Sequence, residues 1–201
     1  YFHDAREFTE LLLAQPVRRG QLFAGLSLGL GLPLAAAFAL GVTLPFAWHG
    51  LGADADAVAA SRTTLAALVA CGTLLTAVFV ALAFLVATRA DDKVRALGTA
   101  VGTWLLMALV YDGAVLVAVA MLADWPLERP LLGLMLANPI DVARVLLLMR
   151  FDAGAVQGYT GAVFAQVFQG STGLVVAGTA LLCWAALPAA LGLRAFRRKD
   201  F

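Results

Sequence analysis

The chain has 201 residues, of which 62% are hydrophobic and 13% are charged, and its net charge is +1. Soluble domains are about 45–50% apolar and about 25% charged, so this composition excludes a water-soluble globule. The 14 basic and 13 acidic side chains are spread along the chain. Because no basic face is formed, we do not expect nucleic acid as a partner.

Long apolar runs predict membrane-spanning helices over residues 21–48, 63–88, 96–122 and 172–193. Each run exceeds the roughly 20 residues that cross a bilayer core. Pro33 and Pro45 lie within the first run, where a bent or broken helix is expected because neighbouring helices can satisfy the freed carbonyls. The expected fold class is therefore an all-α polytopic membrane protein with four spans in this chain.

The whole chain, 1–201, is expected to form one transmembrane domain, with a cytoplasmic segment over 1–20 and a cytoplasmic tail over 194–201. Since the sequence starts at Tyr1 rather than Met, we expect an N-terminal part to be missing. The external segment over 123–171 is rich in Leu and Val between prolines, which predicts short helices at or dipping into the outer interface.

A helix start is predicted within this external segment. Asn138 would be the N-cap, Pro139 the first helical residue, and Asp141 would lie near the positive end of the helix dipole.

The orientation follows from the distribution of Lys and Arg, which favour the cytoplasmic side. Ten of these residues lie on the side of both termini: Arg6, Arg18, Arg19, Arg89, Lys93, Arg95, Arg194, Arg197, Arg198 and Lys199. Four lie on the opposite side: Arg62, Arg129, Arg144 and Arg150. Both ends of the chain are therefore expected to be cytoplasmic.

One carboxylate lies inside a predicted span. Asp112, preceded by Tyr111, is in the third span, where a charged side chain costs about 2.5–3.5 kcal/mol on insertion scales. One interpretation makes Asp112 part of a gate, a partner-helix contact or a protonatable group. The other is that it lies close enough to the outer interface to reach water or Arg144.

Motifs for metal binding and catalysis are not found. The soft metal ligands are scattered, so no metal site is expected. The chain has no serine-nucleophile elbow, no zinc-binding His pair and no phosphate-binding glycine loop, so no catalytic residue is expected and any ATP would be bound by another chain. Cys71 and Cys183 both lie in apolar runs and are not expected to form a disulfide.

The N-terminal stretch combines charges, a Leu11-Leu12-Leu13 run and the basic pair Arg18-Arg19 directly before the first span. It is either an interfacial helix that anchors this span or a docking helix for a cytoplasmic partner.

Several motifs resemble a known family. The stretch that begins Glu10-Leu-Leu-Leu-Ala-Gln-Pro is similar to the cytoplasmic segment before the third span of ABC-2 type permeases. The Val110-Tyr111-Asp112 motif, the run from Asn138 to Arg144 and the ending Phe196-Arg-Arg-Lys-Asp-Phe resemble the NosY-type branch, which serves the maturation of nitrous oxide reductase.

The resemblance implies a homodimer of six-span subunits in the inner membrane, each docked on an ATPase subunit that binds ATP and Mg. It implies a coupling segment that contacts the ATPase, comprising Glu7, Glu10, Leu11, Leu12, Leu13, Gln15, Pro16, Arg18 and Arg19. By analogy, the candidate gate residues are Tyr111, Asp112, Asn138, Pro139, Asp141 and Arg144.

In the branch that the chain resembles, a periplasmic carbohydrate-binding β-helix protein rests on the permease, and the complex supports assembly of a copper–sulfide cluster. Because Cys, Met and His do not form a ladder through the spans, a sulfur species or a mechanical signal is favoured over copper as the cargo. Two alternatives stay open. One is an ABC-2 exporter of an unrelated lipid, drug or ion, and the other is a membrane-embedded enzyme that uses Asp112 with Arg144 or Tyr159.

Overall fold

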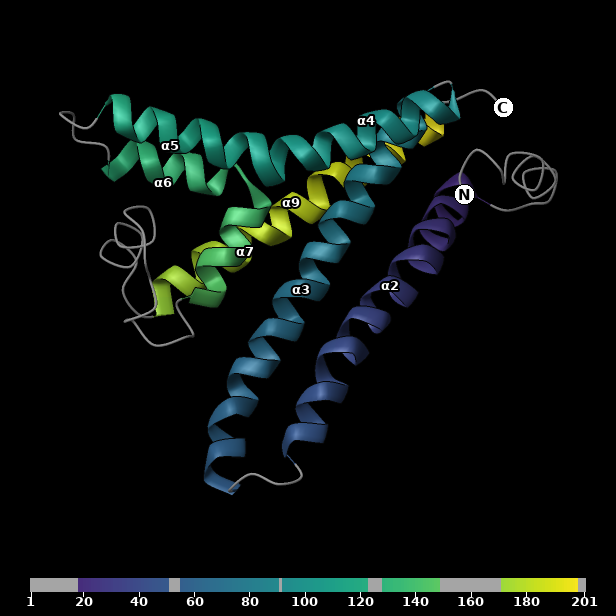
Figure 1. The fold of residues 1–201 in the computed structure, drawn as a ribbon. Coiled ribbons are helices and arrows are strands. Elements are labelled where there is room, and N and C mark those ends of the chain that lie inside the picture. The colour runs from purple at the N-terminus through teal and green to yellow at the C-terminus, as the bar shows by residue number, and fades with distance from the viewer. Residues whose placement is uncertain (1–17, 51–54, 91, 123–127, 149–170, 199–201) are drawn as a thin grey trace.

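The computed structural model describes residues 18–50, 55–90, 92–122, 128–148 and 171–198. Every secondary-structure element in these ranges is a helix, which confirms the all-α expectation. The elements are α2 (Arg19–Gly50), α3 (Ala55–Arg89), α4 (Lys93–Leu105), the π-helical turn η1 (Leu106–Val110), α5 (Tyr111–Met121), α6 (Glu128–Leu136), α7 (Pro139–Leu148) and α9 (Ser171–Arg198). Figure 1 shows their arrangement.

Four helical segments are long and apolar enough to cross a membrane, as the hydropathy predicts. They are Arg19–Trp48, Arg62–Arg89, Lys93–Met121 and Val175–Arg198. We call them the first to fourth spans, and the third consists of α4, η1 and α5 in direct succession. The ends of these segments lie within a few residues of the predicted ones, although α3 itself begins earlier, at Ala55.

Of the bent or broken helix expected for the first span, the break is not found, because α2 continues as one helix through Pro33 and Pro45. An interior proline removes one hydrogen bond of the helical ladder, and the remaining bonds keep the helix continuous. Helix α9 extends to Arg198, into the region predicted as a cytoplasmic tail. Phe196 in this last turn is fully buried, and its packing holds the end of α9 in helical form.

The first hydrophobic cluster lies where α2 begins and α9 ends. Its buried members are Leu22, Phe23, Leu26, Phe84 and Phe196. The ring centroid of Phe23 is 5.7 Å from that of Phe84, in an edge-to-face arrangement, and 5.6 Å from that of Phe196. This cluster therefore joins the start of the first span to the ends of the second and fourth.

The second hydrophobic cluster joins the α6–α7 pair to the second and fourth spans. Its buried members are Cys71 from α3, Met135 from α6, Val142, Ala143 and Val145 from α7, and Ala177 and Leu181 from α9. Val142 and Val145 lie three positions apart in α7 and are both buried in this cluster.

The third span packs differently from the others. In the described part of the chain, no residue of its most apolar 18-residue window is buried. In Figure 1, α4 and α5 run across the other spans instead of alongside them. Its large side chains Trp104, Leu109 and Leu116 are exposed, so this span depends on the few contacts described below for its position.

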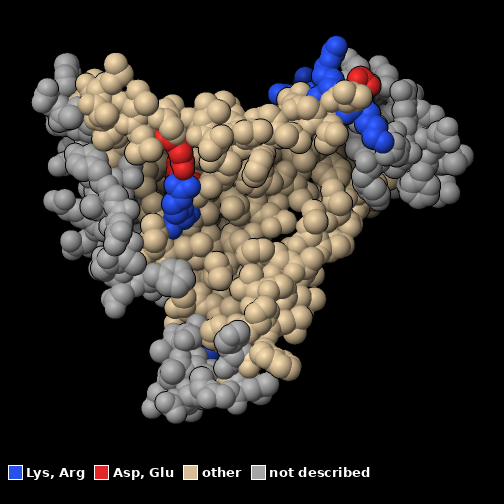
Figure 2. Space-filling model, viewed as in Figure 1, with Lys and Arg blue, Asp and Glu red and all other residues tan. Residues whose placement is uncertain are grey.

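Basic side chains gather at one end of the molecule in Figure 2. This is the end where α2 and α4 begin and where α3 and α9 end. The described Lys and Arg residues that predict the cytoplasmic side lie at these same helix ends. Arg19 at the start of α2 donates from Nη1 to the backbone oxygen of Arg197 at a distance of 3.2 Å.

Candidate functional site

Helices α6 and α7 form a sharply bent pair, which we call the hairpin. The helix axis changes direction by 104° between them, at Ala137 and Asn138. Helix α7 begins at Pro139, directly after Asn138, so the predicted helix start is confirmed. The bend contacts the third span, because Asn138 bonds to Met107, the middle residue of that span. The position of these helices at or dipping into the outer interface stays a prediction.

Asn138 is fully buried at this bend and uses both ends of its amide. Its Oδ1 accepts a hydrogen bond from the backbone N–H of Ile140 at 3.1 Å, which is the expected N-cap interaction. Its Nδ2 donates to the backbone oxygen of Met107 at 2.9 Å and to Oδ2 of Asp141 at 3.1 Å. One side chain therefore starts α7 and also ties it to the third span.

The contacted part of the third span is the π-helical turn. Met107 lies in η1 (Leu106–Val110), where the backbone departs from the regular i→i+4 ladder. Tyr111, the next residue after η1, donates its hydroxyl to the backbone oxygen of Leu134 in α6 at 2.6 Å. The same oxygen also accepts from the backbone N–H of Ala137 at 3.1 Å, so the Tyr111 hydroxyl adds a second hydrogen bond that ties the third span to the last turn of α6.

Arg144 lies between two carboxylates, one in the third span and one in the hairpin. Its Nη2 is 2.9 Å from Oδ2 of Asp112 in the first turn of α5. Its Nη1 is 3.1 Å from Oδ1 of Asp141, three residues earlier in α7. The Arg144 side chain is 51% exposed and the Asp112 side chain 30% exposed. In Figure 2, one acidic and one basic patch lie in contact on the left of the described surface, away from the basic side chains at the other end.

The structure thus brings the candidate gate residues together. Three contacts join the third span to the hairpin: Met107 with Asn138, Tyr111 with Leu134, and Asp112 with Arg144. Pro139 is fully buried as the first residue of α7. Of the two interpretations of Asp112, the structure bears out the contact with Arg144, and the role in a gate stays a prediction.

Two contacts of the hairpin were not predicted from the sequence. The indole Nε1 of Trp184 in α9 donates to the backbone oxygen of Leu136 at 3.0 Å. The thiol of Cys71 in α3 donates to the backbone oxygen of Ala143 at 3.5 Å. A tryptophan N–H buried in an apolar run generally finds an acceptor, which was the available signal for Trp184, although it does not identify the acceptor.

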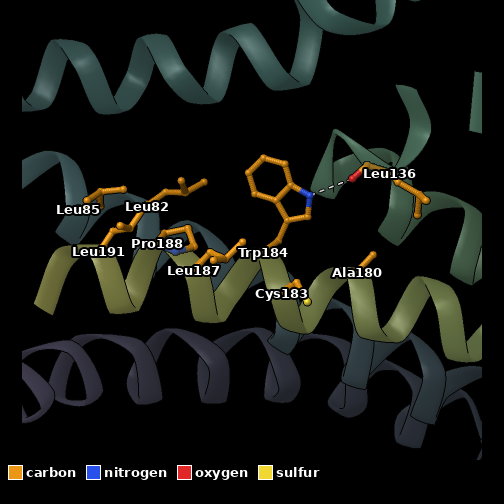
Figure 3. A pocket seen from close by; sticks show the side chains of 9 residues that line it. All are labelled: Leu82, Leu85, Leu136, Ala180, Cys183, Trp184, Leu187, Pro188 and Leu191. Atoms are coloured by element: carbon orange, nitrogen blue, oxygen red, sulfur yellow. Dashed lines mark hydrogen bonds between the residues drawn. The ribbon is translucent and has the colours of Figure 1, made fainter. Parts of the chain in front are cut away.

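An apolar pocket of about 450 Å³ adjoins Trp184. It is lined by Leu82, Leu85, Leu136, Ala180, Cys183, Trp184, Leu187, Pro188 and Leu191. Figure 3 shows the indole of Trp184 standing between this pocket and the carbonyl of Leu136. Cys71 and Cys183 are both free thiols.

The remaining site predictions have no structural description. Residues 1–17, which include the predicted coupling residues from Glu7 to Pro16, lie outside the described ranges, as does Tyr159. Arg18 and Arg19 are described at the start of α2, and the backbone N–H of Arg18 donates to the side-chain oxygen of Gln21 at 3.2 Å. Within the described ranges, no group of three His, Cys, Asp or Glu residues could hold a metal ion.

Four helical segments long and apolar enough to cross a membrane, with a polar-anchored hairpin between the last two, define a polytopic all-α membrane protein. The sequence model of the ABC-2 family transporter proteins matches residues 9–201. The chain therefore belongs to the ABC-2 transporter family and is a permease subunit of an ABC transporter.

Two curated relatives carry the same name. The chain is 34% identical over 203 residues to the probable ABC transporter permease protein NosY of Pseudomonas aeruginosa, a match that covers 94% of this chain and 67% of the relative. It is 32% identical over 157 residues to the protein of the same name from Stutzerimonas stutzeri, which covers 74% of this chain and 54% of the relative. The chain thus spans between about half and two thirds of the length of these relatives.

Proposed function

We propose that this chain is the membrane subunit of a NosY-type ABC transporter that supports copper–sulfur cluster maturation of nitrous oxide reductase. The observation that carries the proposal is the similarity to NosY over 94% of the chain. In this role the subunit passes a sulfur species across the membrane or transmits a mechanical signal to a periplasmic partner.

The proposed assembly is a homodimer in the inner membrane, with two copies of a cytoplasmic ATPase and a periplasmic carbohydrate-binding β-helix protein. ATP and Mg bind to the ATPase, and this chain carries no catalytic residue. Both ends of the chain are placed in the cytoplasm. This orientation is supported by the ten Lys and Arg residues on one side against four on the other, and by the basic end of the molecule in Figure 2.

The gate in this proposal is the contact between the hairpin and the third span. It is supported by the three polar contacts at Met107, Tyr111 and Asp112. In an apolar layer such contacts have two discrete arrangements, made and broken, because an intermediate separation leaves polar groups without partners. A two-state contact of this kind is what an ATP-driven conformational cycle requires.

The test is purification of the tagged full-length protein from its native membrane in mild detergent, followed by mass spectrometry of the co-purifying chains. An ATPase together with a periplasmic β-helix protein in fixed stoichiometry is the expected result. An ATPase without the β-helix protein would overturn the Nos-type role and leave an ABC-2 exporter of an unrelated lipid, drug or ion. Turnover of a substrate by the purified subunit without an ATPase would favour the membrane-embedded enzyme.

A further inference from the structure

We propose that α9 transmits movement from the cytoplasmic end of the first span to the hairpin, and that Trp184 is the positioning residue through which it does so. This inference rests on the proposed function, since it names the element that connects the coupling segment with the gate. It is carried by contacts at two separated points of one continuous helix.

The first point is the last turn of α9. Phe196 is fully buried, and its ring centroid lies 5.6 Å from that of Phe23. Arg19 donates to the backbone oxygen of Arg197 at 3.2 Å. A Cβ added at Gly20 would lie 3.1 Å from Nη2 of Arg197, so the guanidinium of Arg197 lies against the first turn of α2. The start of α2, which directly follows the predicted coupling segment, is therefore bound to the end of α9.

The second point is Trp184, twelve residues before Phe196 and therefore about 18 Å away along the helix. Its indole N–H donates to the oxygen of Leu136, the last residue of α6. The last carbonyls of a helix have no partner within it, so in an apolar layer this oxygen depends on an external donor. Trp184 provides that donor at the bend that Asn138 ties to the third span.

The segment between the two points is suited to transmission because α9 runs without interruption from Ser171 to Arg198, through Pro188. Apolar packing of Ala177 and Leu181 against the hairpin adds contact area, but such contact has little directional preference. The hydrogen bond of Trp184 is the described polar contact that fixes where the bend of the hairpin lies relative to α9. Loss of this bond is expected to loosen the bend without detaching the hairpin.

The first experiment measures hydrogen–deuterium exchange of the hairpin amides in the full-length protein in lipid nanodiscs. Trp184→Phe keeps the ring and removes the N–H. We expect exchange at residues 136–138 to become about fivefold faster, as loss of one hydrogen bond predicts. Trp104→Phe, on the exposed face of α4, is the matched control and should leave this exchange unchanged. Equal exchange in both variants would overturn the role of Trp184.

The second experiment asks whether the contact carries a signal. Exchange of the hairpin is compared between the nucleotide-free complex with the ATPase and the complex trapped with ATP and vanadate. We expect the nucleotide-dependent difference to be lost in Trp184→Phe, to persist in Trp104→Phe, and to shrink in Phe196→Leu. Because both contacts lie on one path, the double variant should lose no more than Trp184→Phe alone.

The outcomes separate this inference from the proposed function. A nucleotide-dependent difference of unchanged size in Trp184→Phe would overturn transmission through α9 while leaving the ATPase partnership in place. If no ATPase associates with the protein, the proposed function fails and the transmission role fails with it. In that case the exchange measurement on the permease alone still decides whether Trp184 holds the hairpin.

Discussion

The side-chain amide of Asn138 donates a hydrogen bond to the backbone oxygen of Met107, 2.9 Å away in space and 31 positions away in sequence. The donor lies at the bend of the hairpin and the acceptor lies in the π-helical turn of the third span. The two irregular backbone segments near the centre of the molecule are therefore joined directly. This makes Asn138 the residue whose replacement is most informative.

Asn138→Ala should lower the thermal stability of the protein in detergent. It removes an N-cap, at a cost of about 1 kcal/mol, and the hydrogen bond to the backbone oxygen of Met107, at a cost of about 0.5–1.5 kcal/mol. Asn138→Ser is the matched control, because Ser restores the N-cap but does not reach Met107. Its unfolding temperature should lie between those of the wild type and Asn138→Ala. If both variants unfold at the wild-type temperature, the contact does not stabilise the fold.

Arg144→Gln should be more damaging than Asp112→Asn. Without Arg144, the carboxylates of Asp112 and Asp141 lose their shared cation, whereas without the Asp112 charge Arg144 keeps Asp141. We expect a difference of about 1 kcal/mol in the free energy of unfolding, since Arg144 is half exposed. Adding Asp112→Asn to Arg144→Gln should recover part of the loss. A double variant less stable than Arg144→Gln would contradict the proposed electrostatics.

Gly72→Ala should destabilise the packing of α2 against α3. A Cβ added at Gly72 would overlap the ring of Phe38, whereas one added at Gly41 would meet no atom within 4 Å. Overpacking of this kind costs about 1–3 kcal/mol, and Gly41→Ala should be neutral or slightly stabilising because Ala favours helix. Unfolding midpoints in detergent check this pair. Phe38→Leu should rescue Gly72→Ala if the clash with the ring is the cause.

The predicted coupling segment is tested by Glu10→Lys and Leu12→Pro. Reversal of the charge changes the docking surface, and a proline in the helix interior costs about 3 kcal/mol. Both variants should uncouple ATP hydrolysis by the associated ATPase from the membrane subunit, measured as loss of mutual stimulation in nanodiscs. Ala14→Ser, in the same segment but outside the predicted contact residues, is the control. Normal stimulation in both variants would refute the docking assignment.

The spans could be predicted from the sequence because hydropathy and charge alone decide them. Runs bounded by Arg19, Arg62, Arg89 and Lys93 became helices with nearly the same ends. The start of α7 was also predictable, because the N-cap and the first-turn proline act through neighbouring backbone. The break considered at Pro33 and Pro45 is not found, because one lost hydrogen bond does not interrupt a long helix.

The contacts of the hairpin could not be predicted, because α6 and α7 have only 9 and 10 residues and neither is long enough to be recognised as a span on its own. Their position is decided by distant partners: Met107, Tyr111 and Trp184. The sequence did identify Asp112 and Arg144 as candidates because charges in apolar surroundings need a partner. Apolar and aromatic residues such as Trp184 carry no comparable signal.

The π-helical turn makes the effect of a deletion in the third span depend on where the deletion falls. Such a turn holds one residue more than an α-helical turn would. Deletion of one residue from Leu106–Val110 would restore a regular helix and leave Tyr111 and Asp112 facing the hairpin, because the turn already absorbs the extra residue. Deletion of one residue from the regular helix α4 would instead rotate the segment before the deletion by about 100° relative to Tyr111 and Asp112. The third span should therefore tolerate the loss of one residue within the π-helical turn better than the loss of one residue within α4.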